Sequence, residues 1–491
     1  MRIKRKQSSA ILAMIVGSLG LMLSLLQLID DKFVFAVLTL LLLGYLWYEV
    51  VQIRRDYPKH WLLHPAVICS VMFFFMGYGG TNVLFFLPPA AFDYLGLVPE
   101  VSPAMVTHQY LVLLGAFTLF LGYSSPLAIH FTRPHMVERF QNRFFPGTDV
   151  LKEWAIPVLV LVGFSARLFA IRLGLFGYGG DYSAERLAET SGYSQFLVMA
   201  GSLSTLALLL AALRYFTTPS PKNASFWFWV ILLDEIFFGF LSGMKSSVVM
   251  PLVIVGFAFY LQRGIISKKL IILAIASLVV AYAVVEPFRV LRNKRGGSLT
   301  SVSSIVDLVE VGFKGNSSST SEEGGAGAFI TSFAARSNLS YIGSFGIEYA
   351  DTYEKLPPGS PEFLNNIFLA PLHALVPRFI WNSKPLGNLG LWYNQQVMGR
   401  SHFSSTGMGP FTYLYFAGGY VAVGIAFFIF GVFQRMLFFL FSPSGRKAGV
   451  VIYLTMLPSL AIIDSSVNGI LISIFRLVPL LLICTQLLFR R

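Results

Sequence analysis

Positively charged and aromatic side chains meet in one short stretch, VPRFIWNSKPLG, at residues 376–387. Arg378 offers a planar fork of donors that fits phosphate oxygens in pairs, and Lys384 adds a point charge. Trp381 lies between them, and its ring could stack on a sugar or anchor the chain at a membrane interface. The residue types of this stretch therefore suit the binding of a phosphorylated group.

Three further arginines interrupt apolar stretches, at Arg167, Arg172 and Arg476. A lone cation at membrane depth costs at least about 2.5 to 3.5 kcal/mol, so each is expected to face a polar cavity or an anionic partner. The alternatives are snorkelling to the lipid head groups or pairing with a carboxylate such as Asp464. Together the three arginines predict an outward-facing anion site.

Three other charged residues lie at or within apolar stretches. Lys245, in FLSGMKSSVVMP, occupies a tight hairpin turn, where it would contact either lipid phosphate or substrate. Asp234 and Glu235 are adjacent in ILLDEIFFG. An acid pair at membrane depth suggests a functional site, although an internal salt bridge or a water-filled pocket would also accommodate it.

Two residues are candidates for a general base, His402 and Glu348. The pKa range of histidine suits proton transfer, but His402 could equally be a hydrogen-bonded structural residue. The sequence contains no dense carboxylate cluster for metal chelation and no nucleotide-binding glycine loop before a helix. We therefore expect neither a metal nor another cofactor.

The elements that must position these residues are transmembrane helices. Hydrophobic residues make up 55% of the chain and charged residues only 12%, far from the soluble average of about 25% charged. Cys69 and Cys484 both fall in apolar runs, where they resemble small core residues. Apolar runs long enough to cross a bilayer predict an all-α polytopic membrane protein with about twelve spans. The predicted spans are 10–29, 33–53, 65–87, 105–129, 154–176, 195–216, 225–243, 246–261, 269–288, 409–434, 447–464 and 467–489.

The distribution of lysine and arginine assigns the two sides. More than half of the 37 basic residues fall in the two termini and in the loops on the same side as them. By the positive-inside rule, both termini are therefore cytoplasmic. This also accounts for much of the net charge of +13, so nucleic acid is not expected as a partner. The chain then divides into spans 1–9 (1–288), a large extracytoplasmic loop (289–408) and spans 10–12 (409–491).

The large loop has parts of different character. Its basic beginning, EPFRVLRNKRGG, leads into a tract rich in glycine and serine, GFKGNSSSTSEEGGAGAF. The segment EFLNNIFLAPLHALVPRFIW (362–381) is apolar enough to touch lipid but is broken by Pro371 and Pro377, which favours short helices or a re-entrant segment. Long loops cross a membrane largely regardless of charge, so the basic residues of this loop invite a functional interpretation.

Several patches resemble the Wzy-type oligosaccharide repeat-unit polymerases of bacterial O-antigen, capsule and exopolysaccharide synthesis. They are PRFIWNSKPLG, STGMGPFTYLYFAGGYVAVG, GYGGDYSAERLAETSGYSQF, SGMKSS and ARSNLSYIGSF. The resemblance covers most of the chain in architecture but only these patches in residues. It implies a C-type membrane glycosyltransferase of the bacterial inner membrane that joins polyprenyl-diphosphate-linked glycans outside the cytoplasm. The implied partners are this lipid-linked glycan, membrane lipids, a chain-length regulator and a flippase.

The resemblance also implies roles for individual residues. Basic residues in the outer loops of those polymerases are thought to hold the diphosphate or acidic sugars, and Lys245 stands where relatives often carry arginine, which binds phosphate bidentately. The other matching positions are Arg289, Arg292, Arg336, Arg378 and Lys384.

Two other functions stay open at this point. A related O-antigen ligase would transfer a finished glycan to a lipid or protein acceptor. A transporter of lipid-linked glycans would have twelve spans but no bond chemistry. Because carriers commonly divide into two six-span halves, a large loop after the ninth span argues against a transporter.

Overall fold

The computed structural model describes residues 2–86, 100–145, 148–177, 184–221, 223–277, 279–280, 338–353, 356–357, 360–377, 380–381, 384, 389–400, 406–442, 445–457 and 466–489. These residues are mainly helical, with one isolated β-bridge between Leu151 and Phe489. Nine helical stretches in this part of the chain are long and apolar enough to cross a membrane. They are α2 (Asp31–Asp56), α3 (Pro65–Ile68) continued by η2 (Cys69–Gly79) and η3 (Gly80–Phe86), α4 (Pro103–Ser124), α7 (Ala155–Arg172), α8 (Ala184–Phe216), α9 (Ala224–Leu241), α10 (Lys245–Arg263), α18 (Gly409–Leu440) and α20 (Val467–Leu488).

The nine stretches correspond to nine of the twelve predicted spans. Two more predicted spans are helices with shorter apolar segments, α1 (Arg2–Leu25) and α19 (Lys447–Met456). The predicted span 269–288 is helical at residues 268–277 and 279–280, and the rest of it lies outside the described residues. The prediction of an all-helical, multi-pass membrane protein is confirmed, whereas the number twelve stays a prediction.

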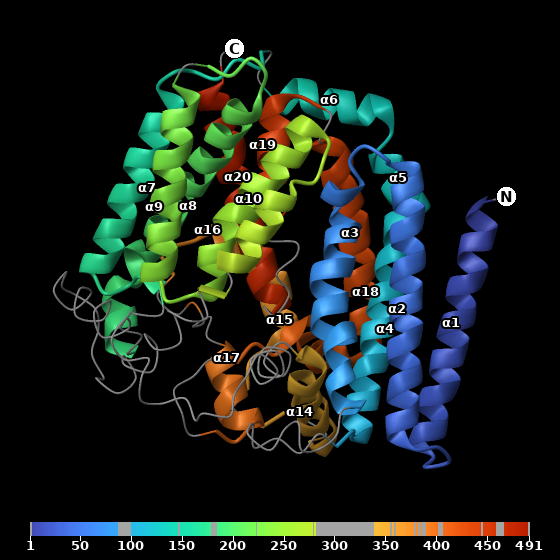
Figure 1. Cartoon of the computed structure of the whole chain (residues 1–491). Helices are drawn as coiled ribbons and strands as arrows, with labels where there is room; N and C mark the ends of the chain where they lie inside the picture. Colours follow the sequence, from blue (N-terminus) through green and yellow to red (C-terminus); the bar gives the residue numbers. More distant parts are fainter. Residues whose placement is uncertain are drawn as a thin grey trace, which may run out of the picture.

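The helices pack around two hydrophobic cores. One core joins α7, α8, α9, α10, α19 and α20, and the other joins α1, α2, α3, η2 and α4. Figure 1 shows these two groups side by side, with α18 reaching both. Helix α18 therefore connects the two halves of the molecule.

Glycines bring α18 and α4 into backbone contact. A Cβ atom on Gly431 would overlap the carbonyl oxygen of Leu119, and one on Gly122 would overlap the carbonyl oxygen of Phe428. Small residues of this kind let membrane helices approach closely, where van der Waals contact takes the place of the hydrophobic effect. The two helices therefore form a tight contact within the core that contains α4.

One end of the helix bundle collects loops that were predicted to share a side. Two short helices, α5 (Pro126–Phe131) and α6 (Pro134–Phe144), follow α4 there, and α6 lies across the helix ends in Figure 1. Arg446 donates a hydrogen bond to Asn142 Oδ1. Tyr260 donates one to the carbonyl of Lys59 at 3.0 Å. The ring of Tyr57 also lies 5.2 Å from that of Phe438, which joins the two pairs, so four basic loops share this end of the bundle.

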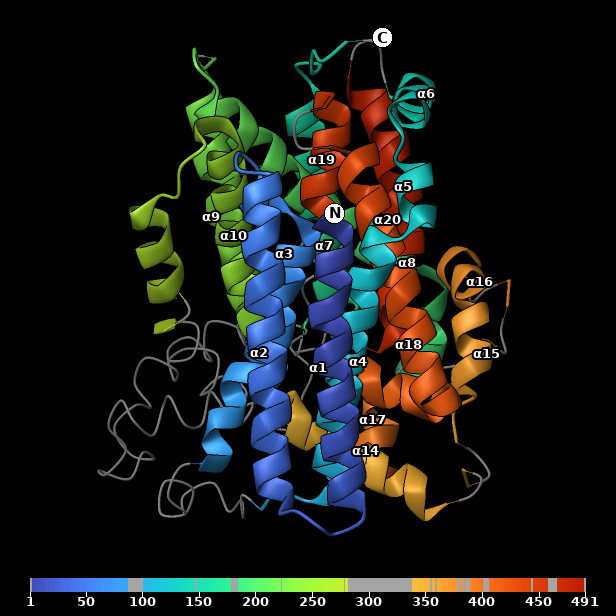
Figure 2. The ribbon, with the colours of Figure 1, turned by 90° about the vertical axis from the view of Figure 1, so that its right-hand side faces the viewer.

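The described part of the large loop lies mainly at the opposite end, which we call the loop end. Helix α14 (Leu339–Thr352), the short α17 (Leu389–Trp392) and η8 (Tyr393–Val397) lie at the bottom of Figure 1. Helices α15 (Phe363–Phe368) and α16 (Ala370–Leu375) rise from there along the bundle, as Figure 2 shows, and α16 packs against α20. This arrangement of short helices fits the expectation for residues 362–381.

A buried polar network fixes the start of α14 on the membrane helices. Asn338 caps this helix and donates from Nδ2 to Asn82 Oδ1 at 3.0 Å, while Asn82 donates to Thr39 Oγ1 at 3.0 Å. Ser340 donates to Gln109 Oε1 at 3.0 Å. Because buried polar groups are costly unless they are paired, these reciprocal bonds specify where α14 docks.

The first turn of α14 is held from its other side as well. Thr412 of α18 donates to the carbonyl of Gly343 at 3.1 Å, and Tyr393 of η8 donates to that of Ile342 at 2.6 Å. The ring of His108 packs so closely on Gly343 that a Cβ atom there would overlap it. Helix α14 is therefore a fixed part of the bundle rather than a detached loop element.

Candidate functional site

Two of the predicted substrate-binding cations come together at the carboxyl end of α16. The last carbonyl groups of a helix have no partner within the helix, and basic side chains often satisfy them. Lys384 donates from Nζ to the carbonyl oxygens of His373 at 2.5 Å and Val376 at 3.0 Å. Only 9% of Lys384 is exposed. The backbone of this helix end therefore holds a buried ammonium group in place.

Arg476 approaches the same helix end from α20. Its Nε donates to the carbonyl oxygen of Ala374 at 3.3 Å, and Gln195 of α8 donates to that oxygen at 2.6 Å. A guanidinium group has five N–H donors, and this bond uses one of them. Arg476 forms no ion pair with any carboxylate among the residues that the structure describes. Asp464, the carboxylate predicted as an alternative partner, lies outside the described residues, so the terminal amino groups of Arg476 have no anionic partner within the described part of the chain.

An aromatic side chain completes this group of residues. The ring centroid of Trp381 lies 5.2 Å from that of His373, with 33° between the two ring planes. We call this group the α16 site, and it consists of Gln195, His373, Ala374, Trp381, Lys384 and Arg476. The site combines two cations with an indole ring at one end of a short helix.

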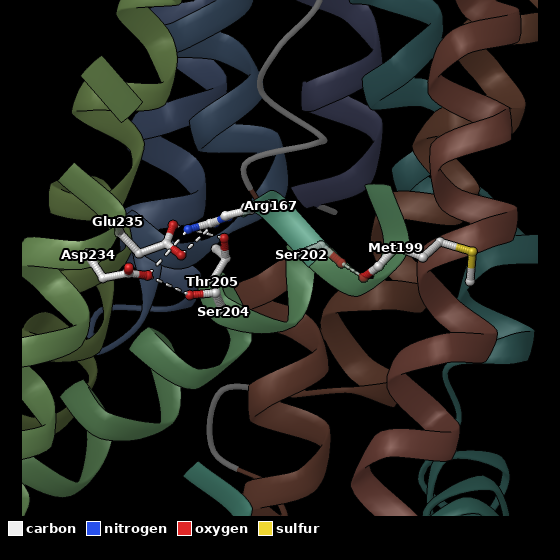
Figure 3. A network of polar contacts seen from close by, with 7 residues as sticks. All are labelled: Arg167, Met199, Ser202, Ser204, Thr205, Asp234 and Glu235. Carbon is white, nitrogen blue, oxygen red and sulfur yellow. Dashed lines mark hydrogen bonds and ion pairs between the residues drawn. The ribbon is translucent and has the colours of Figure 1, made fainter. Parts of the chain in front are cut away.

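Arg167 has a different environment, shown in Figure 3. Its guanidinium lies 2.6 Å from Glu235 Oε1 and 3.6 Å from Asp234 Oδ2. Thr205 donates to Glu235 at 3.1 Å, and Ser204 donates to Asp234 at 3.2 Å. Arg167 thus has its anionic partners within the chain. This is the internal salt bridge that the sequence analysis gave as one alternative for Asp234 and Glu235. We therefore remove Arg167 from the proposed substrate site.

The other described candidates lie apart from these two clusters. Arg172 is the last residue of α7 and is exposed, and Lys245 is the first residue of α10. Glu348 is exposed on α14, where its carbonyl accepts a hydrogen bond from Thr352. Arg172 and Glu348 are thus on the surface, and Lys245 lies at the turn between α9 and α10. The remaining candidates lie outside the described residues: Arg289, Arg292, Arg336, Arg378 and His402.

Sequence reasoning missed two side chains of the α16 site, Gln195 and His373. The sequence APLHALVP places His373 between Pro371 and Pro377, within the segment predicted to form short helices. Gln195 had no signal in the sequence, since only the fold brings α8 beside α16. His108 was also missed: it is 1% exposed, and neither ring nitrogen has a hydrogen-bond partner among the described residues. No group of His, Cys, Asp and Glu side chains in the described ranges is arranged to hold a metal ion.

A family model described as "Domain of unknown function (DUF8712)" matches residues 170–440, more than half of the chain. The chain belongs to this family. The matched region includes α8, α16 and Lys384, whereas Arg476 and Arg167 lie outside it. No curated protein and no solved structure matches the chain. Membership of DUF8712 brings no activity with it, so a functional proposal has to rest on the residues themselves.

Proposed function

We propose that this protein is a metal-independent glycosyltransferase that polymerises polyprenyl-diphosphate-linked oligosaccharide repeat units at the outer face of the bacterial inner membrane. In this proposal the loop end is extracytoplasmic and both termini are cytoplasmic. The observation that supports it most is the α16 site, where Arg476 and Lys384 meet although they are far apart in the sequence. The resemblance to Wzy-type polymerases supplies the class of substrate.

The proposed reaction breaks the bond between the sugar C1 and the diphosphate oxygen of the donor. A hydroxyl group of the acceptor forms the new bond to C1 and gives up its proton, and polyprenyl diphosphate leaves with the electron pair. Cations fixed beside the leaving oxygen stabilise this developing charge without rearranging. In this proposal Arg476 and Lys384 take this role, and Trp381 stacks on the first sugar ring.

The acceptor proton needs a receiver, for which His402 and Glu348 are the candidates. Holding the two reactants in line could supply much of the rate by itself. Arg289, Arg292, Arg336 and Arg378 are proposed to hold the rest of the diphosphate or acidic sugars. The partners in this proposal are the lipid-linked glycan, membrane lipids, a chain-length regulator and a flippase.

The test uses membranes that contain the single-unit lipid-linked substrate, with the product analysed as a ladder of chain lengths. Arg476→Ala is expected to lower ladder formation by about 100-fold, the usual effect of removing one group that stabilises the transition state. Arg476→Lys should retain part of the activity because it keeps the charge but loses the paired donors. Arg139→Ala, an exposed arginine of α6 at the opposite end, is the matched control.

Three further variants, Arg289→Ala, Arg336→Ala and Arg378→Ala, test the rest of the cation set. We expect long-chain polysaccharide to be lost at normal protein levels. A wild-type ladder from Arg476→Ala would contradict the role of the α16 site. A single shift of an acceptor in place of a ladder would identify a ligase, and no bond formation by the wild type would favour a transporter.

A further inference from the structure

Helix α18 is interrupted near the loop end by two glycines. Gly419 has φ 63° and ψ −148°, a conformation that residues with a side chain rarely adopt. No heavy atom other than its own neighbours lies within 4 Å of a Cβ built on Gly419, and Gly418 is exposed. The interruption therefore borders open space.

An interrupted helix needs polar partners. Backbone groups released from the helical ladder are costly next to lipid, so irregular backbone in membrane helices occurs where it lines a cavity or a binding site. Sixteen residues separate Gly419 from Arg435 near the opposite end, which corresponds to about 24 Å at a rise of 1.5 Å per residue. The interruption thus lies toward the outer side of a hydrocarbon core about 30 Å thick.

Aromatic rings from α14 and α17 lie next to this interruption. The centroids of Tyr349 and Tyr353 are 4.8 Å apart, and Trp392 lies 6.2 Å from Tyr349 at an interplanar angle of 85°. Trp392 also lies 5.9 Å from Phe416, two residues before Gly418. Tyr353 is 43% exposed. Rings that remain accessible in this way can stack on the C–H faces of sugars.

Carboxylates lie on the last two turns of the same helix, α14. Asp351 of α14 accepts a hydrogen bond from the hydroxyl of Tyr415 at 2.8 Å, and Glu348 is exposed one turn earlier on α14. Carboxylate oxygens accept hydrogen bonds from sugar hydroxyls but repel phosphate. The charge of this surface is therefore opposite to that of the α16 site.

We propose that Tyr349, Asp351, Tyr353, Trp392 and Tyr415, together with the interruption at Gly419, form a subsite for neutral sugar rings of the acceptor glycan. This inference rests on the proposed function and assigns the donor diphosphate and the acceptor sugars to two different surfaces. The donor diphosphate binds at the cationic α16 site, and the acceptor sugars bind between α14 and α18. Stacking on the rings and hydrogen bonds to Asp351 and to the interrupted backbone hold the acceptor hydroxyl in position.

The test measures ladder formation against the concentration of lipid-linked repeat unit for the full-length protein in membranes. Trp392→Ala and Asp351→Asn are expected to raise the apparent KM at least fivefold. The concentration of added polyprenyl diphosphate that halves the rate should stay as in the wild type, because the donor site is intact. Trp47→Ala, a 72% exposed tryptophan of α2, is the matched control for loss of an indole.

A second pair of variants separates stacking from anchoring in the membrane interface. Trp392→Tyr should recover most of the affinity and Trp392→Leu should not, since leucine keeps the apolar surface without the aromatic face. Wild-type KM values in Trp392→Ala and Asp351→Asn, or in Trp392→Leu, would overturn the subsite while the polymerase proposal stands. No ladder from the wild type would instead overturn the polymerase proposal and this inference with it.

Discussion

At the scale of single residues, two arginines in membrane helices show how their surroundings decide their role. Arg167 lies between two carboxylates, whereas Arg476 touches a backbone carbonyl and has no described carboxylate partner. The sequence placed both in apolar stretches and could not separate them, because their partners come from other helices. A carboxylate partner from the same chain therefore marks an arginine as structural, and an arginine without one is a candidate for substrate binding.

The salt bridge of Arg167 leads to a prediction about stability. Arg167→Met leaves the buried Glu235 and the partly buried Asp234 without a cation and should lower the free energy of unfolding by about 3 to 5 kcal/mol. Asp234→Asn should be close to neutral, since the cluster has one more carboxylate than cations. Thermal unfolding in detergent measures this order. A loss for Asp234→Asn as large as that for Arg167→Met would contradict it.

His64, just before α3, gives a prediction about pH. Burial, and secondarily the charge of Arg435, lowers the pKa of His64 from 6.5 to about 3. Below pH 6.5 the unfolded chain therefore takes up a proton that the folded protein does not, so this histidine reduces stability as the pH falls from 6.5 toward 3. Its share between pH 7 and pH 5 is about 2 kcal/mol.

The measurement compares unfolding temperatures at pH 7 and pH 5. His64→Phe should lose less stability over this interval than the wild type, even though the variant also loses the 2.7 Å hydrogen bond to Tyr123 at both pH values. His130→Phe, at an exposed histidine of α5, is the control and should follow the wild type. Equal pH dependence in His64→Phe and the wild type would exclude the role of His64.

At the scale of helices, hydrophobicity predicted most of the spans but not the places where helices touch. Runs such as those of α2 and α18 are long enough to be identified by composition alone. The docking of α14 depends on pairs such as Asn338 with Asn82, which are distant in sequence and carry no periodic signal. Equally, the meeting of Lys384 and Arg476 at α16 follows from packing, which a hydropathy pattern does not contain.

The contact between α4 and α18 can be tested by one added methyl group. Gly431→Ala would push against the Leu119 carbonyl, which is backbone and cannot rotate away, so we expect a loss of about 1 to 3 kcal/mol. Gly256→Ala in α10 has no heavy atom within 4 Å of the new Cβ and should be neutral or slightly stabilising. Unfolding temperatures in detergent distinguish the two variants, and similar values would contradict the close contact.

At the scale of the whole molecule, the structure joins the basic loops at one end and α14 with α17 at the other. Charge counting predicted this grouping because the positive-inside rule depends on composition and not on packing. Which end faces the cytoplasm is a separate matter that labelling can test.

Single cysteines at the two ends report the orientation. The native Cys69 and Cys484 are both buried, so their background labelling should be low. Gln396→Cys, at an exposed position of η8, should react with an impermeant maleimide in intact spheroplasts. Arg139→Cys in α6 should react only after the membrane is opened. The reverse pattern would place the loop end in the cytosol and remove the basis of the polymerase proposal.

The backbone contacts of Gly122 with Phe428 and of Gly431 with Leu119 limit how α4 and α18 can move. A carrier that rocks between inward-open and outward-open shapes must part its two lobes once per cycle. Here α18 packs in both hydrophobic cores. Moving it away from α4 would break van der Waals contacts between main-chain atoms. We therefore expect α4 and α18 to form a rigid frame, so that under the proposed function only the short segments at the loop end would shift with each turnover.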